Sequence, residues 1–203
     1  MKKEKTNKLV SKDYLTIGLY TVVSLVISFA LSMLTTPFLV WAYPFATAFV
    51  LFFTCPIYIL LAYKVGKRGT LLTFAIINGL FYAIMGAPFV LPFTLVGGLL
   101  GELILAKFGG YRNLKAQTLA YTVYNLIYGF CNYIVLAISA EYYFSLMQIE
   151  GVLREAYIKY MTTPFWIAVA IALLVIAIVL GCLFGYKLLK KHFIKSGIVS
   201  SSN

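Results

Sequence analysis

The sequence contains few charged residues and almost none of the side chains that perform catalysis. Only 11% of its 203 residues are charged, six of them are acidic, and the single histidine, His192, is close to the C terminus. There is no HExxH motif, no pair of aspartates or serine–histidine pair within an apolar run, and no glycine-rich phosphate loop. We therefore expect no enzymatic activity, no cofactor and no metal.

Cysteine is also scarce. Cys55, Cys131 and Cys182 are odd in number, distant from one another in sequence, and each within an apolar run. This pattern argues against a disulfide framework or a metal site and predicts small buried core residues.

What the chain has in abundance is apolar sequence. Hydrophobic residues make up 62% of it and the mean hydropathy is +0.93, whereas soluble proteins are roughly 45–50% apolar. Six apolar runs approach or exceed the ~20 residues with which a helix crosses a bilayer. They cover residues 14–33, 45–63, 70–87, 89–106, 116–139 and 165–189. The sequence predicts an all-α integral membrane protein, a six-helix membrane domain over residues 13–190 with flanking segments 1–12 and 191–203.

The positive charges predict the orientation of these helices. Of the 17 lysines and arginines, all except Arg154 and Lys159 precede the first run, lie at or after the end of the sixth, or lie in the second-to-third or fourth-to-fifth connection. By the positive-inside rule, both termini are then cytoplasmic. Anionic lipid headgroups account for the net charge of +11, so we expect no nucleic-acid partner.

The connections on the opposite side are aromatic and nearly uncharged. Residues 34–44 carry no charge but include Trp41 and Tyr43, and we expect this apolar loop to fold over the helix ends as a lid. Residues 140–164 include Glu141 and Arg154 and are expected to form at most one short helix. The alternatives are an interfacial aromatic belt and, for the two charged residues, solvated loop positions.

Polar residues form stripes inside two predicted helices. Tyr121, Asn125, Tyr128 and Asn132 share one face of the fifth, and Tyr82 lies on a similar line on the third. Amides and tyrosine rings suit a neutral or zwitterionic planar solute, although interhelical hydrogen bonding would also explain them. The predicted substrate-binding residues are Trp41, Tyr43, Tyr82, Tyr128, Asn132, Glu141 and Arg154.

Two further features have a structural and a functional interpretation. Glu102 is the only carboxylate well inside an apolar run, and it either pairs with Arg112 or Lys115 or couples protons to transport. Small residues four apart, such as Gly97 and Gly101 on the fourth helix and Gly181 and Gly185 on the sixth, allow close contact with another helix or with a partner.

Three segments carry a resemblance to a known family: KDYLTIGLYT (residues 12–21), GGLLGELI (97–104) and GGYR (109–112). In these the chain resembles the substrate-binding S component of energy-coupling factor (ECF) transporters, in the subfamily first noted in treponemes and streptococci. The resemblance implies the bacterial plasma membrane, a T component and two cytoplasmic ATPases as partners. It also implies a pocket formed by helices four to six under the first outer loop, and a docking face at Gly18 and Val22, where Val22 departs from the family's small residues.

The preferred interpretation is a high-affinity binding subunit for ATP-driven uptake of a micronutrient, vitamin-like and planar or heterocyclic. Two alternatives stay open at this point. One is a stand-alone secondary transporter in which Glu102 couples protons, and the other is a membrane scaffold without transport activity.

Overall fold

The computed structural model describes residues 8–194, with side chains for residues 8–191, and this part of the chain contains helices and no strand. Residues 1–7 and 195–203 of the two predicted flanking segments lie outside the described residues. The elements are α1 (Ser11–Thr35), η1 (Thr36–Phe38), α2 (Leu39–Val65), α3 (Thr70–Ile84), α4 (Val90–Lys107), α5 (Leu114–Ile138), α6 (Ala140–Met147), α7 (Gly151–Thr162), α8 (Pro164–Leu188) and η2 (Leu189–Ile194).

Within the described residues, four helical segments are long and apolar enough to cross a membrane: Ser11–Val65, Val90–Lys107, Leu114–Ile138 and Pro164–Lys191. The first contains both α1 and α2, which pack against each other on either side of η1. The apolar helix α3 has 15 residues, about 22 Å at 1.5 Å per residue, and is shorter than a ~30 Å hydrocarbon core. The described part of the chain is thus helical throughout its secondary structure, and several of its helices have the length and composition of membrane spans.

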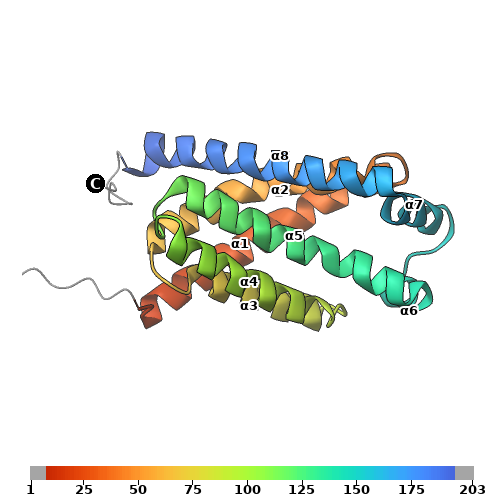
Figure 1. Cartoon of the computed structure of the whole chain (residues 1–203), viewed down its shortest axis with the longest axis horizontal. Helices are drawn as coiled ribbons and strands as arrows, with labels where there is room; N and C mark the ends of the chain where they lie inside the picture. Colours follow the sequence, from red (N-terminus) through yellow and green to blue (C-terminus); the bar gives the residue numbers. More distant parts are fainter. Residues whose placement is uncertain (1–7, 195–203) are drawn as a thin grey trace, which may run out of the picture.

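The long helices form an elongated bundle whose two ends differ (Figure 1). The first residues of α1 and the last residues of α8 lie at one end, hereafter the terminal end. The short helices α6 and α7 lie at the opposite end, next to the turn between α1 and α2.

The predicted apolar loop at residues 34–44 is mostly helical. α1 continues to Thr35, η1 follows, and α2 begins at Leu39, with non-helical dihedral angles only at Ala42. Pro37 is tolerated because it occupies the first turn of η1, and Pro44 disturbs the helix around Ala42 because it lacks an N–H group. The lid expected from the sequence is therefore a kinked helical corner.

The prediction of at most one short helix in residues 140–164 was wrong, because this segment forms both α6 and α7. The Ser139 side chain caps α6 by accepting a hydrogen bond from the Tyr142 N–H. Left-handed backbone at Gln148 (φ 53°) ends α6, and α7 begins at Gly151, which also has a positive φ (58°). The second helix was hard to foresee, because the segment mixes apolar, aromatic and charged residues without a strong helical period.

The glycines spaced four residues apart on α4 and α8 allow these helices to pack closely against their neighbours in the bundle. A Cβ atom at Gly181 would lie 2.7 Å from the Phe52 carbonyl oxygen, and one at Gly185 would lie 2.6 Å from Pro56 Cα, so α8 touches the backbone of α2. On α4, Gly97 faces Tyr124 of α5 in the same way. The predicted close contacts are thus made between helices of the same chain.

The core of the terminal end is filled by large side chains. The Tyr58 ring stacks on the Tyr121 ring with 3.9 Å between centroids, and the Tyr58 hydroxyl donates to Gln117 Oε1 at 2.6 Å. Gln117 Nε2 in turn donates to the Tyr111 carbonyl oxygen at 2.7 Å.

The cysteines are buried and form no disulfide in the described part of the chain, as predicted. They are Cys55, Cys131 and Cys182.

Candidate functional site

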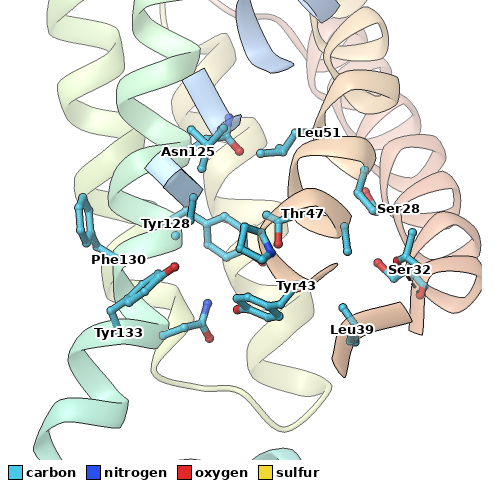
Figure 2. Close-up of a pocket in the computed structure, with 18 of the residues that line it drawn as sticks. Ser28, Ser32, Leu39, Tyr43, Thr47, Leu51, Asn125, Tyr128, Phe130 and Tyr133 are labelled. Atoms are coloured by element: carbon cyan, nitrogen blue, oxygen red, sulfur yellow. Dashed lines mark hydrogen bonds between the residues drawn. The ribbon is translucent and has the colours of Figure 1, made fainter. Parts of the chain in front are cut away.

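A cavity of about 500 Å³ lies in the half of the bundle near α6 and α7. Pockets that bind small molecules in proteins typically measure about 300–1,000 Å³. Its lining comes mainly from α1, α2, α5 and α8, with further residues from η1, α3, α6 and α7. Figure 2 shows α5 residues on one side and α1 residues on the other, with Tyr43 and Thr47 of α2 between them.

The structure brings four of the predicted site residues to this cavity: Tyr43, Tyr82, Tyr128 and Asn132. The Tyr82 and Tyr128 rings lie 5.8 Å apart, and Tyr128 also stacks on Tyr124 of the same helix with 6.4 Å between centroids. One side of the cavity is therefore built of tyrosine rings held in place by their neighbours.

The amide groups at the cavity are only partly occupied by hydrogen bonds. Asn125 Nδ2 donates to the Tyr121 carbonyl oxygen at 2.8 Å, which leaves its Oδ1 as an acceptor. Asn132 Oδ1 accepts a long hydrogen bond, 3.5 Å, from the Tyr143 hydroxyl. Both amides can therefore present polar atoms to a solute.

Sequence reasoning missed the hydroxyl groups on the opposite side of the cavity. Ser28, Ser32 and Thr35 recur on α1 at spacings of four and three, and Thr36 of η1 follows them. Together these four residues are called the hydroxyl face. The spacing is a detectable signal of one helix face, but single hydroxyls attract less attention in an apolar run than asparagine or tyrosine.

Helices α6 and α7 close the end of the cavity. Tyr143 and Met147 of α6 and Tyr157 of α7 line it, and the Tyr157 ring lies 4.6 Å from the Tyr43 ring. Burial raises the pKa of Tyr143 and of Tyr157 above the usual tyrosine range, and for Tyr143 the nearby Tyr157 adds to the shift. Both hydroxyls are therefore neutral donors at physiological pH.

The other three predicted residues lie away from the cavity. Trp41 is 73% exposed, and its backbone carbonyl accepts a hydrogen bond from the Tyr160 hydroxyl at 2.7 Å. Glu141 of α6 and Arg154 of α7 form an ion pair on the surface, in which the Glu141 side chain is 84% exposed. Because residues 140–164 form two helices, Glu141 of α6 and Arg154 of α7 contact each other and do not line the cavity.

The helices that form the cavity also differ from those implied by the family resemblance. α5 and α8 contribute as expected, but among the described residues α4 contributes none, and α1 and α2 supply most of the remaining lining. α4 instead packs between α3 and α5 through its glycines, which leaves no room for a cavity there.

Glu102 lies at the terminal end, away from the cavity, and is 9% exposed. Its carboxylate accepts hydrogen bonds from the backbone N–H groups of Gly69, Leu71 and Leu72, at 3.0, 2.9 and 3.3 Å. These groups belong to the first turn of α3, where backbone donors are unpaired and the helix dipole favours negative charge. Glu102 thus caps α3 from α4, a role that the sequence did not suggest.

One known protein family matches nearly all of the chain. A family model described as hypothetical bacterial integral membrane protein (Trep_Strep) matches residues 11–195. The chain belongs to the Trep_Strep family. No curated protein and no solved structure gave a significant match.

The predicted docking residues of this Trep_Strep protein lie on the outer surface of α1. Val22 is 54% exposed, and a Cβ atom at Gly18 would meet no atom within 4 Å. Leu15, Leu19 and Val26 are also exposed on this helix. The surface is apolar and open, so lipid or another membrane protein can reach it.

Proposed function

We propose that this Trep_Strep protein is the substrate-binding S component of an ECF-type uptake transporter in the bacterial plasma membrane. The observation that carries the proposal is the cavity of about 500 Å³, which is lined by tyrosine rings, amides and hydroxyls. Such a lining suits the capture of a vitamin-like planar solute. The lining residues together do not make up a recognisable catalytic set.

The proposed topology has six membrane helices, α1, α2, α3, α4, α5 and α8, with both termini in the cytoplasm. The basic residues described at the terminal end, including Lys64, Lys67 and Arg112, support this orientation. The cavity would then open towards the outer side, where an uptake system meets its solute. α3 would cross only with help from the flanking turns, because it is short.

Transport requires energy that this chain has no motif to supply. A T component and two cytoplasmic ATPases are the proposed partners, with the T component docking against α1 at Gly18 and Val22. The exposure of that face supports the assignment. Binding of the solute, closure by the α1–α2 corner with α6 and α7, and reorientation driven by the ATPases would deliver the solute inward.

The first test is mass spectrometry of small molecules released from gently purified protein. We expect one compound to be enriched in the wild type and lost from the Tyr128→Ala/Asn132→Ala variant, because both side chains line the cavity. An identical set of released molecules in both proteins would contradict the proposal.

The partner assignment needs a separate experiment. Gly18→Leu should reduce copurification of the T component while leaving the yield of folded protein unchanged, since the added side chain points into open space. Undiminished complex formation would remove Gly18 from the docking surface. Uptake in vesicles that lack the ATPases would instead favour a stand-alone transporter.

A further inference from the structure

The charge of the cavity restricts the solute that it can hold. Among the described residues that line it, none carries a carboxylate, ammonium or guanidinium group. Moving an ion from water into such a site costs several kcal/mol unless a counter-charge is present, as a general order of magnitude. The nearby ion pair of Glu141 and Arg154 is already matched and lies on the surface.

The two sides of the cavity differ in chemistry. On the α5 side, Tyr128 and Tyr133 project from the helix, and Tyr82 of α3 stands beside Tyr128. On the α1 side, Figure 2 places Ser28 and Ser32 of the hydroxyl face. A flat ring of a solute would find stacking partners at the tyrosines, whereas its hydroxyl groups would find hydrogen-bond partners along α1.

The hydroxyl face presents a row of polar atoms rather than a single contact. Ser28 and Thr35 are seven positions apart, which corresponds to about 10 Å along the helix. The Thr36 hydroxyl donates a hydrogen bond to the Ser32 carbonyl oxygen at 2.8 Å, and the Thr35 hydroxyl donates one to the Leu31 carbonyl oxygen at 3.1 Å. Their oxygens therefore remain acceptors for hydroxyl protons of a solute, and Ser28 and Ser32 can both donate and accept.

We infer that the solute is an uncharged compound with two parts, a flat heterocycle that stacks at Tyr82 and Tyr128 and a polyhydroxylated chain or sugar that lies along the hydroxyl face. This inference rests on the proposed binding function and adds the chemical class of the solute. A nucleoside or a ring carrying a polyol chain belongs to this class, whereas the free ring and the phosphorylated form do not.

The test is a calorimetric binding panel on the full-length protein in detergent. The ring–polyol probes are uridine, adenosine and riboflavin, and each is matched by its ring alone (uracil, adenine, lumichrome) and by its monophosphate (UMP, AMP, FMN). We expect at least one ring–polyol probe to bind about tenfold or more tightly than its ring and about a hundredfold more tightly than its phosphate.

Variants assign the effect to the hydroxyl face. Ser28→Ala/Ser32→Ala should weaken the ring–polyol probe about tenfold and leave the affinity for the matched ring unchanged. Ser145→Ala is the control, because Ser145 is exposed on α6 and does not line the cavity. Equal weakening of both probes, equal affinity of ring and ring–polyol, or preference for a phosphate would overturn the inference.

The panel separates this inference from the proposed function. If no panel compound binds and the solute that co-purifies with the wild type is charged or lacks a ring–polyol structure, the solute class is wrong and the binding function stands. If no panel compound binds and nothing co-purifies, both are wrong.

Discussion

The terminal half of the bundle is filled by interlocked side chains, whereas the half near α6 and α7 encloses a cavity of about 500 Å³, although α1, α2, α5 and α8 run through both. The difference comes from side-chain size. α2 carries Tyr58 in the filled half and Thr47 at the cavity, and α1 carries Ile17 in the first and Ser28 in the second. Smaller polar side chains thus line the cavity, at positions of α1 and α2 that lie further along the same helices than the large side chains of the filled half.

The largest expected effect comes from breaking the filled half. Gly181→Leu places a side chain where a Cβ atom already lies 2.7 Å from the Phe52 carbonyl oxygen, so α8 must move away from α2. We expect the free energy of unfolding to fall by about 3 kcal/mol or more. Little monomeric protein should then appear in size-exclusion chromatography. Gly18→Leu is the matched control and should elute like the wild type. Equal yields for both variants would contradict the close packing of α8 on α2.

A smaller effect is expected at the cap of α3. Glu102→Gln removes the negative charge from a site where the carboxylate accepts three backbone hydrogen bonds. We expect a loss of about 1.5–3 kcal/mol in unfolding free energy, measured by thermal or chemical denaturation in detergent. Glu155→Gln, at an exposed position on α7, should have little effect.

The same Glu102 variant separates two transport mechanisms. If Glu102 serves only to cap α3, transport by the protein that still folds should be nearly normal, because Glu102 is remote from the cavity. Abolished uptake with unchanged stability and unchanged solute binding would instead indicate proton coupling.

A substitution in the cavity should change binding more than stability. Tyr128→Ala removes a ring that faces the cavity and contacts Tyr82, so affinity for the solute should fall about tenfold or more in calorimetry. Tyr128→Phe keeps the ring and should retain most of the affinity. Unchanged binding by the alanine variant would place the solute elsewhere.

The smallest effect is expected at the surface ion pair of α6 and α7. Glu141→Gln breaks its contact with Arg154, but an exposed pair contributes little to stability. Melting temperature and solute affinity should both match the wild type within error. A clear loss of affinity would mean that this charged pair takes part in solute binding after all.

The helical nature of the chain could be predicted because long apolar runs have few alternatives in a membrane. Each predicted run corresponds to a helix, and their internal contacts follow from small-residue spacing, as at Gly181. The connections could not be predicted, because whether residues 140–164 form one helix or two depends on local turns at Gln148 and Gly151.

The site was predictable only where polar residues stood out from apolar helices. Tyr82, Tyr128 and Asn132 formed visible stripes, and the fold brings them to one cavity with Tyr43. The serines of α1 were missed because hydroxyls are common in membrane helices. The position of Arg154 could not be predicted, because its contacts with Glu141 and Phe144 of α6 require the helix α7, which the sequence did not predict.

The most direct test of the central claim, that the hollow half holds a solute, is to fill the cavity without disturbing the packed half. Gly129 lines the cavity, and a Cβ atom there would meet only Leu174 Cδ1, at 3.8 Å. Small molecules released from the wild type and from Gly129→Phe would be compared by mass spectrometry, together with their melting temperatures. We predict that the variant melts at or above the wild-type temperature and releases no enriched compound. Release of the same compound by both proteins, or of none by the wild type, would contradict the claim.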